Sequence, residues 1–185
     1  TDTISHFDGQ VWKHFTSGNE LAGGMVFSFM EANGYIWVGT LGLSRYNQQN
    51  RSWEILFQSP PGPVPTPIPQ NSIVVEALSE GVHAISPANQ EAIWVGTSRG
   101  LTYLKNNSQQ TWTNSDLNTD GVRCLLTITE TEVWVCTENG VGLWDGIQWI
   151  EFVEKLIDPF LLVRGEGKDV WIVTRESGVV RWDGV

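Results

Sequence analysis

A five-residue stretch, Ile36-Trp37-Val38-Gly39-Thr40, recurs three times along this chain and constrains its fold more than any other feature. The later copies are Ile93-Trp94-Val95-Gly96-Thr97, Val133-Trp134-Val135-Cys136-Thr137 and Val170-Trp171-Ile172-Val173-Thr174. Their tryptophans lie 57, 40 and 37 residues apart. Each copy is rich in β-branched and aromatic residues, which favour a buried strand. A strand-rich unit that repeats every ~40 residues is typical of a β-propeller.

The residues around each copy predict a four-stranded antiparallel unit. A first strand begins 13 residues before each tryptophan, and this constant length indicates a fixed hairpin. The repeated stretch is the second strand, and a turn ending in glycine follows it. A third strand then carries an aromatic residue, and a fourth carries a tryptophan. The first strands start at Gly24, Gly81, Gly121 and Asp158; the turn glycines are Gly42, Gly100, Gly140 and Gly178; the third-strand aromatics are Tyr46, Tyr103, Trp144 and Trp182; the fourth-strand tryptophans are Trp53, Trp112 and Trp149.

The two ends of the chain predict how such units close into a ring. Phe7-Asp8-Gly9-Gln10-Val11-Trp12 matches Trp144-Asp145-Gly146-Ile147-Gln148-Trp149, whereas the last unit reaches only Trp182-Asp183-Gly184-Val185. We therefore expect the N-terminal strand to complete the last blade and remove its open edge. The prediction is an all-β fold: a β-propeller with four four-stranded antiparallel blades. Two other arrangements fit the same ends, namely two chains forming one eight-bladed ring and a fragment of a larger propeller.

The predicted domain is a single propeller over residues 1–185, interrupted by one proline-rich insertion at 59–72. Dense proline excludes both strand ladders and helix, so we expect a polyproline-like surface loop there. It is either a tolerated insertion or a functional loop, since loops of this length often have a role. The blades are expected at about 20–58, 73–114, 115–153 and 154–185, the last together with 6–16.

Charge and hydropathy exclude two classes of partner. The chain has 21 acidic and 11 basic residues, a formal net charge of −10, and an acidic surface repels nucleic acid and anionic lipid. No apolar run reaches the ~20 residues that span a bilayer, so we expect a soluble protein without membrane insertion.

No catalytic motif, cofactor motif or metal-ligand spacing stands out. His6, His14 and His83 fall on different predicted strands, and we expect no metal site from them. The segment Asp116–Gly121 resembles the first half of a calcium loop but has Thr127 where the final glutamate belongs. It is interpreted as a capped turn or, alternatively, as a weak calcium site.

Two cysteines lie on neighbouring predicted strands. Counting back from the turn at Thr129–Thr131 places Cys124 roughly opposite Cys136. They are either two small buried thiols or, in an oxidising compartment, a cross-strand disulfide.

The first strands give the best indication of a functional site. The residues two positions after the start of each first strand are Val26, His83, Arg123 and Phe160. In a propeller this part of the innermost strand meets the mouth of the central channel. Two of these four residues can be cationic within otherwise apolar strands. We expect His83 and Arg123, with Glu80 and Asp120 in the preceding loops, to form a ligand or partner surface. The alternative is that they only pair with nearby carboxylates.

The repeated unit, best seen in Ile36–Trp53 and Ile93–Trp112, resembles the two-component regulator propeller repeat. In the third and fourth copies Cys136 and Val173 replace its glycine. The resemblance implies a bacterial, periplasmic or extracellular sensor module that binds a small molecule, glycan or protein and is not an enzyme. An enzyme of the lyase or glycan-active kind, with its site at the channel mouth, is one alternative. A purely structural module that assembles with itself as a homo-oligomer is another.

Overall fold

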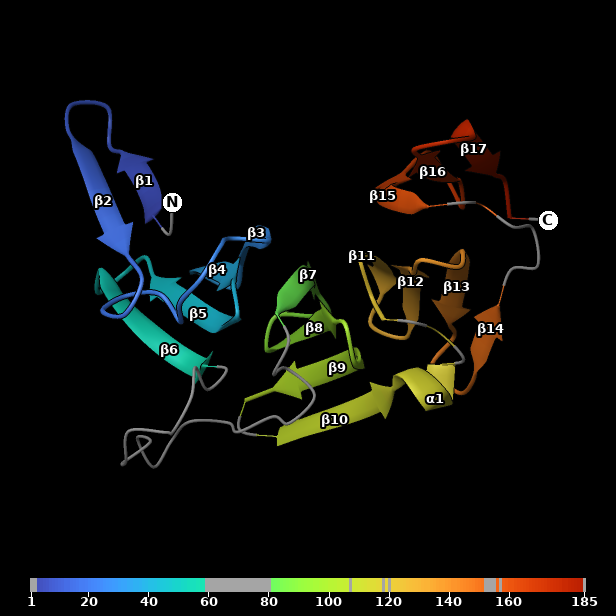
Figure 1. Cartoon of the computed structure of the whole chain (residues 1–185), viewed down its shortest axis with the longest axis horizontal. Helices are drawn as coiled ribbons and strands as arrows, with labels where there is room; N and C mark the ends of the chain where they lie inside the picture. Colours follow the sequence, from blue (N-terminus) through green and yellow to red (C-terminus); the bar gives the residue numbers. More distant parts are fainter. Residues whose placement is uncertain are drawn as a thin grey trace. The chain divides into compact units, whose positions relative to one another are not determined.

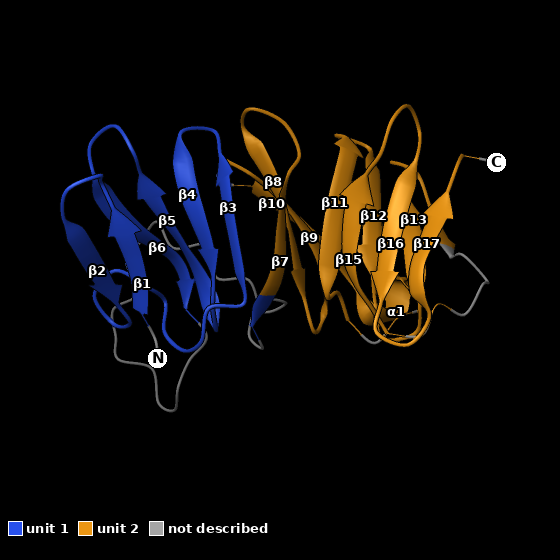
Figure 2. Ribbon diagram, turned by 90° about the horizontal axis from the view of Figure 1, so that it is seen from above, with its two compact units in different colours: residues 1–82 blue, residues 83–185 orange. Residues whose placement is uncertain are grey.

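The computed structural model describes residues 3–58, 81–106, 108–117, 119, 121–151, 156 and 158–184. These residues form antiparallel sheets and one helical turn, as predicted for an all-β chain. They divide into two compact units, residues 1–82 and 83–185, coloured separately in Figure 2. Among the described residues, no helix is long and apolar enough to cross a bilayer.

Unit 1 contains a two-stranded hairpin and a four-stranded sheet (Figure 1). The N-terminal hairpin consists of β1 (Thr3–Phe7) and β2 (Trp12–Thr16). Sheet I consists of β3 (Ser28–Ala32), β4 (Tyr35–Gly39), β5 (Gly42–Asn47) and β6 (Ser52–Gln58), in that order. Its first strand starts later than predicted, because Gly23 and Gly24 both have positive φ, 102° and 76°, and interrupt the extended backbone.

Unit 2 contains three further sheets of the same sequential order. Sheet II has β8 (Ala92–Thr97), β9 (Gly100–Lys105) and β10 (Ser108–Thr113), and its first strand, β7 (Val82–Pro87), starts at the boundary between the units. Sheet III has β11 (Cys124–Thr129), β12 (Glu132–Cys136), β13 (Val141–Trp144) and β14 (Trp149–Glu151). Sheet IV has β15 (Pro159–Arg164), β16 (Val170–Thr174) and β17 (Gly178–Trp182). A short helix, α1 (Asn114–Leu117), follows β10.

The structure adds a strand that the sequence did not predict at the N-terminus. Within unit 1, residues Thr3–Phe7 form β1 and pair with β2. Sheet IV has three strands among the described residues of unit 2, and its completion by residues 6–16 stays a prediction. Trp12 pairs with Phe7, just as Trp149 pairs with Trp144 in sheet III. The matching sequence is therefore a whole hairpin formed by third and fourth strands. A contact so local in sequence forms with little loss of chain entropy.

The threonine of each repeated stretch closes the turn that follows it. Thr97 Oγ1 donates to the carbonyl of Gly100 at 3.4 Å and accepts the N–H of Arg99 at 3.1 Å. The threonines of the other three copies make the same two hydrogen bonds, one to a glycine carbonyl and one from a backbone N–H of the turn. The residue that donates this N–H differs in its distance from the threonine. Because one hydroxyl satisfies two backbone groups, threonine is retained where the glycine varies.

The glycine of the repeated stretch makes room for the next sheet. A Cβ on Gly96 would lie 2.2 Å from Val122 Cγ1, in the segment that enters sheet III. The Val122 N–H also donates to the carbonyl of Thr97 at 2.7 Å, which ties the entry of sheet III to the end of β8. Cys136 stands at the equivalent position in sheet III.

The core of unit 2 consists of two layers of apolar side chains on either side of sheet III. On one side, Trp94, Leu101, Leu117, Val122, Val133 and Val135 pack between sheets II and III. On the other side, Trp134, Leu162, Val170 and Ile172 pack with the cysteines between sheets III and IV. Successive residues of β12 thus point to opposite layers, as expected for a strand buried on both faces.

Candidate functional site

The strongest polar cluster in unit 2 surrounds Arg123, immediately before β11. One guanidinium nitrogen donates to Asp158 Oδ1 and the other to Glu138 Oε1. Arg175 lies 3.5 Å from the second oxygen of Asp158, and its backbone N–H donates to the Asp158 carbonyl at 3.2 Å. We call these four residues the Arg123 cluster.

The order of the strands brings these residues together. Asp158 precedes β15, Glu138 lies in the turn after β12, and Arg175 follows β16. In an antiparallel sheet the start of the first strand and the end of the second lie at the same edge. Arg123 and Asp158 precede the first strands of sheets III and IV, and Glu138 and Arg175 follow the second strands. All four residues therefore lie at the same end of these two sheets.

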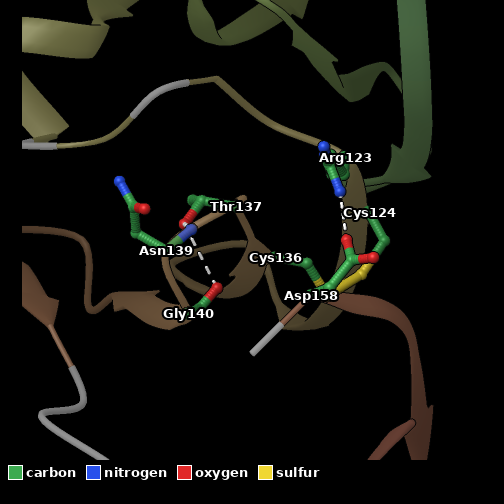
Figure 3. The surroundings of a disulfide bond; sticks show 7 residues. All are labelled: Arg123, Cys124, Cys136, Thr137, Asn139, Gly140 and Asp158. Atoms are coloured by element: carbon green, nitrogen blue, oxygen red, sulfur yellow. Dashed lines mark hydrogen bonds and ion pairs between the residues drawn. A yellow bond between two sulfur atoms is a disulfide. The ribbon is translucent and has the colours of Figure 1, made fainter. Parts of the chain in front are cut away.

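A disulfide between Cys124 and Cys136 lies directly beside the cluster (Figure 3). The two residues are opposite each other in the register of β11 and β12, with Cα atoms 4.9 Å apart. Of the two alternatives left open by the sequence, the structure contains the bonded form. The link joins the start of β11 to the end of β12, so it fixes the backbone that carries Arg123 and Glu138.

The Arg123 cluster is accessible to solvent. Side-chain exposure is 34% for Arg123, 28% for Asp158 and 56% for Glu138. Arg175 also lies over the ring of Phe160, with 5.8 Å between its guanidinium carbon and the ring centroid. The cluster thus presents two cations and two anions, whose formal charges balance, next to the aromatic ring of Phe160.

The predicted site residues fall in different places. Arg123 is in the cluster, and its pairing with carboxylates agrees with the alternative that the sequence left open. His83 is half-buried near the start of β7, the strand in sheet II that corresponds to β11. Glu80, Asp120 and the proline-rich insertion lie outside the described residues.

Sequence reasoning did not select Glu138 and Arg175. A signal for them exists, because each directly follows the threonine of a repeated stretch, Thr137 and Thr174. That position lies at the end of the sheet where the first strand begins.

A second polar cluster links sheets II and III within unit 2. Glu130 Oε1 accepts the Tyr103 hydroxyl at 2.5 Å and the Asn89 amide at 2.6 Å. Burial is the main cause that raises the pKa of Tyr103, and the hydrogen bond to Glu130 adds to it. These hydrogen bonds link the turn between β7 and β8, and strand β9, to the turn between β11 and β12.

The possible calcium segment contributes to a cap. Asp116 Oδ2 accepts both the N–H and the hydroxyl of Thr113 at 2.7 and 2.8 Å, where α1 begins. The hydroxyl bond is the larger cause that lowers the pKa of Asp116. This agrees with the capped-turn interpretation. Within the described part of the chain, no group of three or more His, Cys, Asp or Glu side chains could hold a metal ion.

Comparison with known proteins gives matches in structure but not in sequence. No protein-family model matches the chain, and no curated protein matches it. The extracellular domain of BT3049, described as a hybrid two-component system of B. thetaiotaomicron, matches at a TM-score of 0.73 and 16% identity, covering 99% of this chain and 26% of that domain.

Two structures of the extracellular domain of BT4673, from the same organism, also match. One, described as a one-component system, has a TM-score of 0.67 and 16% identity over 98% of this chain and 25% of its own. The other, described as a hybrid two-component system, has a TM-score of 0.63 and 18% identity, with 94% and 23% covered. This chain therefore shares the fold of a part of the extracellular domains of bacterial one- and two-component systems.

Proposed function

We propose that this chain belongs to an extracellular, non-enzymatic ligand-binding module, in which the sheets are blades of a β-propeller. Two findings support the proposal. The strands of each sheet follow one another in sequence and are antiparallel, as in propeller blades. The first strands of sheets III and IV, β11 and β15, pack against each other. The fold matches extracellular domains of signalling proteins across almost the whole chain.

We propose the Arg123 cluster as the binding site, with His83 on the corresponding strand β7 as a further contact. Glu80 and Asp120, which the sequence adds to these residues, lie outside the described residues. The observation that carries this placement is the pairing of an accessible arginine with two carboxylates on a strand pair fixed by a disulfide. Polar groups held by a rigid framework lose little freedom when a ligand binds, which favours affinity. Loops carried by such a framework commonly bind ligands.

The chemistry of the cluster favours an uncharged ligand with many hydroxyl groups, such as a glycan. An anionic ligand would have to displace Asp158 or Glu138 from Arg123 and leave a carboxylate without its partner. A sugar hydroxyl can instead donate to a carboxylate and accept from a guanidinium at once, without disturbing the ion pairs. Phe160, under Arg175, adds an apolar surface for a sugar ring.

Catalysis is not favoured by the titratable groups. Among the described residues, the carboxyl groups with a clearly displaced pKa are Asp8, Asp116 and Asp145. In each the pKa is lowered by hydrogen bonds within a turn or cap, the opposite of what a general acid needs.

A glycan array followed by calorimetric titration of the best hits tests the proposal. We expect the double variant Arg123→Ala/His83→Ala to lose at least ~10-fold in affinity, because hydrogen bonds to a charged group are involved. Arg45→Ala is the matched control, since Arg45 is also paired with a carboxylate, Glu54, but lies in sheet I. Unchanged affinity in a folded double variant would overturn the placement of the site.

A further inference from the structure

Two sheet faces at opposite ends of the chain are apolar and exposed. In sheet IV, one side packs on sheet III through Leu162, Val170 and Ile172. The other side, which we call the tail face, is exposed and consists of Leu161, Val163, Trp171 and Val179. In the N-terminal hairpin, Phe15 packs on Tyr46 and Trp53 of sheet I. The opposite side, the head face, carries Phe7 and Trp12, also exposed.

The interfaces inside unit 2 show what covers a tail-type face. The second-strand tryptophans of sheets II and III, Trp94 and Trp134, are 2% and 1% exposed. Trp134 is covered by the third-strand tryptophan of the next sheet, Trp182, with ring centroids 4.6 Å apart. Trp171 is the equivalent second-strand tryptophan of sheet IV, yet it is 40% exposed.

Phe7 has the position of the residue that would cover it. It precedes Asp8-Gly9 as Trp144 precedes Asp145-Gly146, and both aspartates accept two backbone N–H groups in the same turn. In sheet III, Trp144 points to the preceding sheet, where it meets Trp112 at 4.7 Å. The head face is therefore the side that a sheet turns toward its predecessor.

We propose that the head face of one copy of this chain docks on the tail face of a second copy. The contact continues the interface already present between sheets III and IV, with Phe7 and Trp12 placed against Trp171. Arg181, which lies over the Trp171 ring, is already paired with Asp169 at 2.8 Å, so docking buries no unpaired cation there. The interface is heterologous, since two different faces meet, and it closes into a ring only if the rotation allows.

The full chain tests this in sedimentation velocity experiments over a wide concentration range. We expect reversible self-association of the wild type, and at least ~30-fold weaker association for Trp171→Lys and for Trp12→Lys, as for central aromatic residues of an interface. An equimolar mixture of these two variants should associate again, because each then contributes its intact face. Ile147→Lys is the control, since Ile147 is 87% exposed in a turn of sheet III and belongs to neither face.

Several results would overturn the proposal. A wild type that stays monomeric over the whole range would mean that no second copy docks. Association that survives Trp12→Lys but not Trp171→Lys would indicate contact between two tail faces instead. Failure of the mixture to associate would exclude the heterologous pairing. If Trp171→Lys does not give the thermal transition of the control, Val179→Lys probes the same face at a position that is 60% exposed.

Discussion

Replacing Gly96 with alanine would place a methyl group 2.2 Å from Val122 Cγ1 and 2.9 Å from Val122 Cβ. Val122 cannot move away easily, because it is 1% exposed and its N–H donates to the Thr97 carbonyl. Overpacking of this kind lowers the free energy of unfolding by about 1–3 kcal/mol. We expect a loss in this range, although alanine has the better intrinsic conformational preference.

Shortening Val122 should remove the closer of the two contacts, the one with Cγ1, and leave the contact with Cβ at 2.9 Å. Val122→Ala removes two buried methyl groups and should by itself lower the free energy of unfolding by about 2 kcal/mol. In the double variant Gly96→Ala/Val122→Ala the new methyl group occupies part of the space vacated. The double variant should therefore be about 1–2 kcal/mol more stable than the sum of the single effects implies.

Urea denaturation of the four proteins measures this coupling, through the shift of the midpoint at unchanged slope. Gly96→Ala combined with Val141→Ala is the control, because Val141 packs in the layer on the other side of sheet III. That pair should be additive. Additivity in the Gly96 and Val122 pair as well would show that the glycine is not needed for the approach of the next sheet.

Three further perturbations follow from the contacts described. Reduction of the Cys124–Cys136 disulfide, which closes a loop of sequence separation 12, should lower the free energy of unfolding by about 3 kcal/mol, and a Cys124→Ala/Cys136→Ala variant should show no response to reductant in a thermal melt. Tyr103→Phe should cost about 1 kcal/mol; because the folded pKa of Tyr103 is raised, the wild-type advantage is present below its ordinary pKa and is lost as pH rises through the raised value, which urea titrations at alkaline pH would reveal. Hydrogen bonds from the Gln148 and Ile147 N–H groups hold the pKa of Asp145 below its usual value, so its contribution is present above that usual value and is lost as pH falls through the lowered one; in acid titrations monitored by circular dichroism, Asp145→Ala should lack this component.

The repeated strands could be predicted from the sequence because each carries its own local signals. The tryptophan stretches form β4, β8, β12 and β16, and Asp145-Gly146 lies in the turn between β13 and β14. The strand β1 could not be predicted in the same way. Phe7-Asp8-Gly9 matches a turn between third and fourth strands, but Thr3–Phe7 lacks the turn glycine found at or just before the start of the other third strands.

The candidate site was only partly readable, for a physical reason. Arg123 stood out as a charged residue in an apolar strand, and that signal lies in one segment of sequence. Its partners Glu138 and Asp158 come from separate loops, and their meeting depends on how sheets III and IV pack. The sequence does not decide between free thiols and a disulfide, because the residues fix the positions of the two thiols but not the compartment.

Pro159 makes the joint between sheets III and IV different in kind from the joint between sheets II and III. It stands 12 residues before Trp171, as Val122 stands 12 residues before Trp134. Proline has no N–H, so Pro159 cannot donate to the preceding sheet as Val122 donates to the carbonyl of Thr97. Where Val122 makes a peptide hydrogen bond, this joint has the Arg123–Asp158 ion pair instead. Added salt screens exposed charges and hardly affects a hydrogen bond between peptide groups. Rising ionic strength should therefore weaken the contact between sheets III and IV more than the contact between sheets II and III.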